Sequence, residues 1–170
     1  MAEATAVTQL PGEAAAPETA RSIAIIVSKG TLDMAYPGLI LANAARMSGI
    51  EATLFFTFWG LDVITEKKID HLHTPTVGNP SLPIPTLLGG LPGVEAATSS
   101  MMKKQMREID IPSVREMIQI LSDSGAHLYA CSLAMEMFKV KKEDLVPQVE
   151  GVLSAMDFFD KTRGAQLLFV

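Results

Sequence analysis

Cysteine is almost missing from this chain: 170 residues contain one, Cys131. A single thiol excludes an intramolecular disulfide framework, a Cys-x-x-Cys dithiol site and a zinc site built from several cysteines. Any thiol chemistry must therefore use the thiol of another molecule. A lone reduced thiol is also typical of a reducing compartment, so we expect a cytoplasmic protein.

Basic charge is also scarce, with 14 Lys and Arg against 19 Asp and Glu, a net charge of −5 and a pI near 5.2. Without a domain-wide positive field to neutralise phosphates, nucleic acid is not an expected partner. Both nucleotide-binding fingerprints, G-x-x-x-x-G-K-[ST] and G-x-G-x-x-G, are missing. The sequence "SKGT" at residues 28–31 follows the first predicted strand as a phosphate-binding loop would. We interpret it as a tight turn, while an anion or an extended polar substrate at this loop stays open.

Long apolar runs are missing too. No stretch of about 18 uninterrupted apolar residues occurs, so no membrane-spanning helix is predicted. Residues 1–20 contain three glutamates and no basic residue, unlike a secretory leader, and we expect residues 1–21 to be a disordered Ala/Glu-rich tail. The remaining length suits one domain, residues 22–170.

Within that domain, predicted strands alternate with predicted helices. Apolar runs predict strands at 22–28, 51–60, 126–130 and 165–170, with a short extended piece near 150. We predict a helix with Asp33 as N-cap ending at Gly49, and another that opens on a capping box, Ser113 to Glu116, and ends at Gly125. A short helix is predicted from Cys131 to Val140, and another after the extended piece within residues 149–163. This order predicts an α/β fold with a mainly parallel sheet of about five strands and helices on both faces.

Residues 71–100 are rich in proline and glycine, and we predict one long loop there, acting as a lid or a docking surface. Its apolar side chains are expected to be buried at a subunit or partner contact, with association with a membrane surface as the alternative. They are Leu82, Ile84, Leu87, Leu88 and Leu91.

Cys131 lies between a predicted strand and a predicted helix. A free cysteine is often a small buried hydrophobe, but unpaired N–H groups and the helix dipole at such a junction favour a thiolate. His127 cannot activate it, because residues i and i+4 of a strand lie about 13 Å apart. His71 or His73 can fold over the site from the loop. Beside Asp70 these two histidines are too few for a zinc site, so no metal and no cofactor are predicted.

Four stretches of the chain resemble a known family over residues 22–170. They are "AIIVSKGTLDMAYPGLILANAA", "GLPGVEAATSSMMKKQMREIDIPSVREMI", "GAHLYACSLAMEMF" and "EDLVPQVEGVLSAMDFFDKTRGAQLLFV". In them the chain resembles the DsrE/DsrF/TusD-like sulfur-relay family, in particular its larger, stand-alone DsrE-like branch. The resemblance implies a flavodoxin-like fold, a cytoplasmic homo-oligomer and a reactive cysteine that carries sulfane sulfur as a persulfide. Cys131 matches the position of that cysteine.

The leading hypothesis is therefore a sulfane-sulfur carrier or sulfurtransferase with Cys131 as its catalytic residue. By resemblance, its partners are sulfur-donor and sulfur-acceptor proteins of the TusA-like or rhodanese type. Relatives in this branch can carry further cysteines, and their lack here leaves a single-thiol carrier. Whether transfer is catalytic or stoichiometric stays open. The alternatives are a non-catalytic module that binds a small ligand or nucleotide, and a one-cysteine peroxide sensor.

Overall fold

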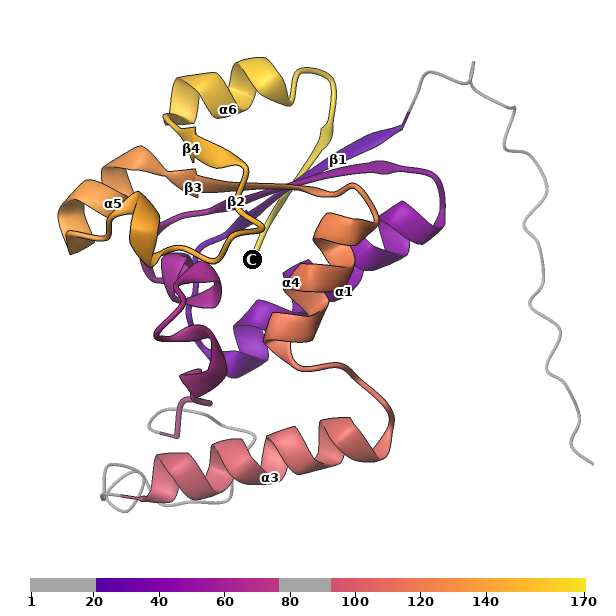
Figure 1. Ribbon diagram of the computed structural model, residues 1–170. Helices are drawn as coiled ribbons and strands as arrows, with labels where there is room; N and C mark the ends of the chain where they lie inside the picture. Colours follow the sequence, from indigo (N-terminus) through magenta and orange to yellow (C-terminus); the bar gives the residue numbers. More distant parts are fainter. Residues whose placement is uncertain (1–20, 77–92) are drawn as a thin grey trace, which may run out of the picture.

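A five-stranded parallel sheet forms the centre of the molecule in a computed structural model that describes residues 21–76 and 93–170 (Figure 1). The order across the sheet is β4-β3-β2-β1-β5, and every neighbouring pair is parallel. The strands are β1 (Ser22–Val27), β2 (Glu51–Phe56), β3 (His127–Cys131), β4 (Gly151–Leu153) and β5 (Gln166–Phe169). The predicted α/β class with about five strands is confirmed, and the expected tail falls almost wholly on residues outside the described ranges.

Helices α1 (Leu32–Met47) and α4 (Val114–Asp123) cover one face of the sheet (Figure 1). Gly38 brings α1 so close to β1 that an added Cβ would lie 3.2 Å from the side chain of Val27. The apolar face predicted for α4 is buried, and its residues are Val114, Met117, Ile118 and Leu121. Gly125, which follows α4, has a φ of +79° that suits glycine.

Helix α6 (Ala155–Lys161) covers the opposite face, where Phe158 stacks on Phe55 with ring centroids 4.6 Å apart. The register pairs Phe55 with Ile26, whose side chain points away from Val27 and hence away from α1. Helices on both faces are therefore confirmed. No helix of the described residues is long and apolar enough to cross a bilayer.

Of the two helix caps predicted from the sequence, one is confirmed and one is wrong. The capping box of Ser113 and Glu116 is present, with the Ser113 side chain accepting from the Glu116 N–H and the Glu116 carboxylate accepting from the Ser113 N–H. The predicted N-cap Asp33 is wrong, because the N-cap of α1 is Thr31. The Ala35 N–H already donates to the Thr31 carbonyl, so helical bonding starts before Asp33, which lies in the first turn.

The predicted loop at residues 71–100 is wrong at its end, because helix α3 (Val94–Glu108) begins inside it. The last helix-breaking residue is Gly93, with a φ of +90°, and residues 94–100 contain neither proline nor glycine. Ser99 attaches α3 to the body by accepting a 2.8 Å hydrogen bond from the Thr74 N–H. The predicted apolar patch from Leu82 to Leu91 lies outside the described residues.

Short elements line the edge of the sheet where the strands end. They are the 3₁₀ helices η1 (Phe58–Ile64), η2 (Ile69–His71) and η3 (Lys142–Asp144), and the helix α5 (Ser132–Phe138). Because all five strands are parallel, their carboxyl ends share this edge, where ligands bind in sheets of this kind.

Candidate active site

Cys131 is the last residue of β3 and the N-cap of α5, as the sequence predicted. Its backbone is extended, with φ −79° and ψ 121°, and its side chain makes no capping hydrogen bond. The thiol is free and the residue is 6% exposed. Burial alone fits the interpretation as a packing residue, so the surroundings must distinguish the two readings.

A pocket of about 370 Å³ opens beside Cys131. Strand β2 lies next to β3 and pairs Phe56 with Ala130, so the residues that follow β2 reach the thiol. The pocket is lined by Thr57, Phe58, Cys131, Leu133, Ala134, Glu136 and Met137. Cys131 lines a pocket at the carboxyl edge of the sheet, and this distinguishes it from an enclosed core residue.

The rim of this pocket is apolar and exposed. Leu133 is 68% exposed and Met137 51%, although both are large hydrophobic side chains. The ring centroids of Phe58 and Phe138 lie 6.2 and 5.9 Å from that of Trp59. We call these five residues the apolar rim. Exposed apolar side chains gathered in this way are typical of protein contact surfaces.

Phe58 adopts a left-handed backbone conformation, with a φ of 47°. This conformation costs a non-glycine residue roughly 1–2 kcal/mol, and such strain tends to occur at functional sites. Backbone hydrogen bonds from Thr57 to the Val27 carbonyl and from Gly60 to the Thr57 carbonyl hold the turn. The turn follows β2 directly, and Phe58 forms part of the pocket wall.

Among the residues that the structure describes, no histidine lines the Cys131 pocket. His127 instead contacts Glu150, with 2.8 Å between Nδ1 and Oε1, and Tyr129 donates a 2.6 Å hydrogen bond to the same carboxylate. Burial and the hydrogen bond with Glu150 raise the pKa of Tyr129. Burial would also raise the pKa of Glu150, but hydrogen bonds from Tyr129 and His127 outweigh it and lower that pKa. This cluster is a polar contact between β3 and the segment before β4.

His71 and His73 line a different pocket, beside the loop that follows β1. The hypothesis that one of them covers Cys131 has no support in the described residues. Across the same residues, no group of three or more His, Cys, Asp or Glu side chains is placed to hold a metal ion.

The sequence did not predict the other residues of the site. Thr57 and Phe58 are 74 and 73 positions before Cys131 in the chain, and only the pairing of β2 with β3 brings them together. Leu133 and Met137 were within reach of sequence reasoning. They are four residues apart on the predicted helix and therefore share one of its faces.

The fold and the matched sequence define the class: the chain belongs to the DsrE/DsrF/DrsH-like family, whose sequence model matches residues 19–169. Among curated proteins, it is 34% identical over 146 residues to the sulfur carrier protein DsrE2 of Allochromatium vinosum, covering 81% of this chain and 91% of that protein. It is 22% identical over 158 residues to the uncharacterized protein YrkE of Bacillus subtilis, covering 90% and 99%. The crystal structure of the YchN protein from E. coli has the same fold, with a TM-score of 0.52, 14% identity, and coverage of 88% of this chain and 99% of that one.

Proposed function

We propose that this protein carries sulfane sulfur and that Cys131 is the residue that holds it. Two things support the proposal. The chain is similar to a protein named as a sulfur carrier over most of both lengths, and the single thiol opens into a pocket at the carboxyl edge of the sheet. The pocket is the observation that carries the proposal. Cys131 is the one residue able to form a persulfide, and the pocket gives a partner access to it.

The exchange needs no oxidant and no reductant. The Cys131 thiolate attacks the outer sulfur of a donor persulfide, R–S–SH. A bond forms between the two sulfurs, the donor S–S bond breaks, and R–S⁻ leaves, so that Cys131 becomes Cys–S–SH. An acceptor thiolate then attacks the outer sulfur of Cys131 and restores the thiolate.

The site suits both halves of this exchange. As N-cap of α5, Cys131 lies beside N–H groups that the first helical turn leaves unpaired, and these favour a negative charge. The largely apolar pocket limits access of water to the bound sulfur. The lining residues include one acid, Glu136, and no base.

The apolar rim gives the donor and acceptor proteins a docking surface. A protein thiol must enter the pocket to meet a side chain that is 6% exposed, so the partner has to contact the residues around the entrance. Leu133 and Met137 on α5 and Trp59 on η1 offer that contact. We further propose that the protein is cytoplasmic, where thiols stay reduced, and that it assembles as a homo-oligomer.

Intact mass measurement after treatment with a low-molecular-weight persulfide tests this function. The wild-type chain is expected to gain the mass of one sulfur atom, to lose it with dithiothreitol, and to pass it to an added acceptor thiol. Cys131→Ser should gain nothing, and its far-ultraviolet circular dichroism should match the wild type. Equal labelling of both proteins, or no labelling of either, would falsify the proposal.

Treatment with peroxide tests the sensor hypothesis on the same residue. A peroxide sensor would form a sulfenic acid at Cys131 faster than it accepts sulfur at equal reagent concentration. We expect the opposite order, because the apolar pocket has no base among its lining residues to promote attack on peroxide. A faster reaction with peroxide would contradict the sulfur-carrier proposal and favour the hypothesis of a peroxide sensor.

A further inference from the structure

A second pocket, of about 250 Å³, lies at the carboxyl end of β1. From β1 the chain moves across the sheet in one direction through β2, β3 and β4, whereas β5 returns to the other side of β1. The order of the strands therefore reverses at β1, and ligands of open α/β sheets bind where such a reversal occurs. The pocket is lined by Gly30, Thr31, Asp62, Lys67, Lys68, His71, Leu72, His73 and Glu95.

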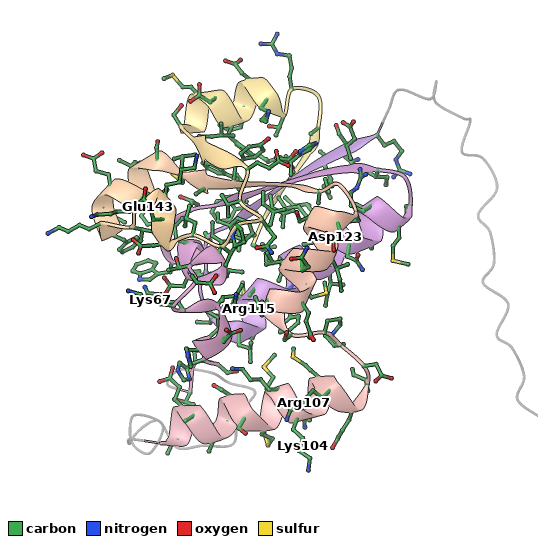
Figure 2. All side chains as sticks on the ribbon, viewed as in Figure 1. Lys67, Lys104, Arg107, Arg115, Asp123 and Glu143 are labelled. Carbon is green, nitrogen blue, oxygen red and sulfur yellow. The ribbon has the colours of Figure 1, made fainter. Side chains whose placement is uncertain are left out.

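Hydrogen-bond donors outnumber carboxylates among the side chains that line this pocket. Lys68 is paired with Asp62 at 2.7 Å, so these two charges compensate each other. Lys67 has no ion-pair partner in the described part of the chain (Figure 2). His71 and His73 add two imidazoles. Against these donors stands one carboxylate without a salt bridge, Glu95.

The backbone of the loop adds further donors. The N–H groups of Gly30 and Thr31, which both line the pocket, donate to no other described residue. Backbone N–H groups are strong donors that native structures rarely leave unpaired away from water. The loop is also fixed in place, because a Cβ on Gly30 would collide with the Trp59 carbonyl oxygen. The pocket thus combines backbone donors, a lysine without an ion-pair contact in the described residues, and two histidines.

We propose that this pocket binds a small oxyanion of the sulfate, thiosulfate or phosphate type. The volume of about 250 Å³ lies below the 300–1,000 Å³ typical of clefts for larger organic ligands, and the lining offers donors that a tetrahedral anion accepts. The 3₁₀ helix η1 separates this site from the Cys131 pocket, since Phe58 at its start lines one and Asp62 lines the other. The inference therefore stands independently of the sulfur-carrier proposal.

Calorimetric titration of the full chain with sodium sulfate, thiosulfate and phosphate at constant ionic strength tests the inference. All titrations use a Cys131→Ser background, so that no sulfur exchange contributes to the heat. Saturable binding of one anion per chain is expected. Tighter binding of thiosulfate or sulfate identifies a sulfur oxyanion as ligand, tighter binding of phosphate identifies a phosphate group, and either supports the oxyanion class.

Substitutions of opposite sign separate an anion site from general surface charge. Lys67→Gln should weaken binding about tenfold, the loss expected when a charged hydrogen bond is removed. Glu95→Gln should strengthen it severalfold, because a repelling carboxylate is gone. The matched control Lys104→Gln lies on α3, away from the pocket, and should change nothing (Figure 2).

Melting curves without anion should coincide for all these variants, which excludes loss of folding as the cause. Absence of saturable binding for all three anions overturns the inference. Weaker binding in both Lys67→Gln and Glu95→Gln also overturns it, because that pattern belongs to a zwitterionic ligand that needs both charges.

Discussion

Gly60 is the residue of η1 that lies directly against the carboxyl end of β1. A Cβ at this position would collide with the carbonyl oxygen of Val27 and lie 2.7 Å from its carbonyl carbon. The Gly60 N–H also donates to the Thr57 carbonyl at 2.9 Å. Neither neighbour is a flexible side chain, so the backbone of η1 would have to move away from β1.

Gly60→Ala is therefore expected to lower the free energy of unfolding by about 3 kcal/mol, the upper end for overpacking. The measurement is the urea midpoint at neutral pH. Gly151→Ala is the matched control, because its Cβ would meet the Tyr129 ring at an ordinary 3.8 Å, and its effect should stay below about 1 kcal/mol. Equal effects of the two substitutions would show that the contact with Val27 is relieved at no cost.

Single residues also show what local sequence reasoning can predict and where it stops. The place of Cys131 between strand and helix followed from an apolar run and a change of period. The N-cap of α1 did not, because Asp33 and Thr31 are both good caps and the choice depends on where the loop lies. That loop is fixed by a tertiary contact, the hydrogen bond from the Leu32 N–H to the His73 carbonyl.

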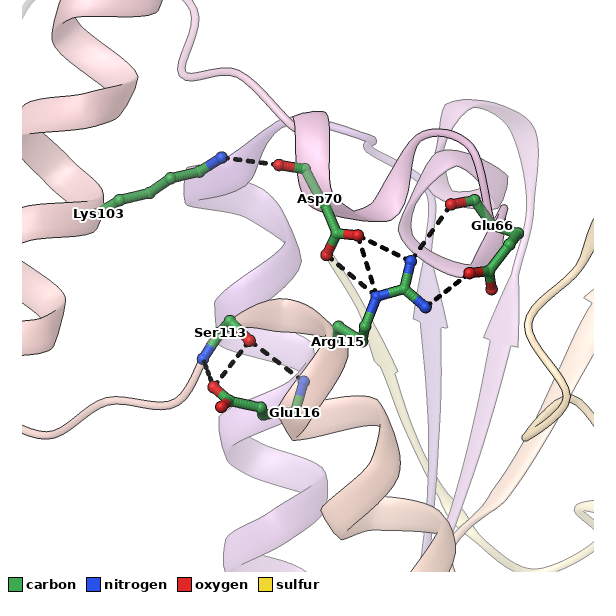
Figure 3. A network of polar contacts seen from close by, with 6 residues as sticks. All are labelled: Glu66, Asp70, Lys103, Ser113, Arg115 and Glu116. Atoms are coloured by element: carbon green, nitrogen blue, oxygen red, sulfur yellow. Dashed lines mark hydrogen bonds and ion pairs between the residues drawn. The ribbon is translucent and has the colours of Figure 1, made fainter.

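At the scale of elements, Arg115 connects α4 to η2 and to Glu66, which lies between η1 and η2 (Figure 3). Its Nε and Nη2 donate to both carboxylate oxygens of Asp70 at 2.8–3.1 Å, and its Nη1 donates to Glu66 at 2.9 Å. On the other side of Asp70, its backbone carbonyl accepts a 3.0 Å hydrogen bond from Lys103 of α3. Asp70 of η2 thus links α3 and α4 to each other.

Arg115→Met should lower the free energy of unfolding by about 1 kcal/mol at pH 7, because the contacts are bidentate but partly exposed to solvent. The urea midpoint measures this loss. Arg163→Met is the matched control, since its 3.1 Å pair with Asp160 is much more exposed and should contribute nothing measurable. A loss as large in Arg163→Met would mean that the effect comes from net charge.

The Arg115 contribution should also depend on pH in a defined direction. The hydrogen bond from Arg115 holds the pKa of Asp70 below its ordinary value of 3.8. A lowered pKa in the folded state stabilises the protein above the ordinary pKa, and this contribution is lost as the pH falls through the folded-state pKa. The difference between Arg115→Met and wild type should therefore shrink below about pH 4 and stay constant from pH 5 to 7.

Helices marked by a capping box or an apolar face were predictable from the sequence. A helix marked only by a lack of proline and glycine was less so. The capping box and the apolar face of α4 both followed from spacing, and the structure confirms them. The start of helix α3 was missed because the loop predicted from the prolines and glycines up to Gly93 was extended over residues 94–100. Its docking depends on Thr74 and Lys103, which local pattern does not reveal.

At the scale of the whole molecule, the order of the strands creates both proposed sites. Alternating strands and helices predicted a parallel sheet, but not that β1 lies between β2 and β5. That order puts the end of β2 beside Cys131 and the reversal beside Gly30. Sequence reasoning named Cys131 and the loop after β1 separately. It could not supply their pockets, whose walls come from η1, a segment positioned by contacts with Val27 and Ser28.

The short helix α6 covers the second face of the sheet, and the contribution of its packing to stability can be measured. Phe158 of α6 is 1% exposed and lies nearly parallel to Phe55, at an interplanar angle of 14°, whereas its neighbour Phe159 is 59% exposed. Phe158→Ala removes an aromatic ring from the core and uncovers Phe55. The expected loss is about 3–5 kcal/mol in the free energy of unfolding.

Phe159→Ala removes the same atoms from the next position of the same helix, and the expected loss is below about 1 kcal/mol because the ring is already in contact with solvent. Urea unfolding followed by circular dichroism measures both variants at one protein concentration. Binding of a hydrophobic dye should rise for Phe158→Ala alone, since only that variant exposes the sheet. If the two losses are equal, α6 is attached to the sheet mainly by contacts other than the stacked pair, and the second face closes without Phe158.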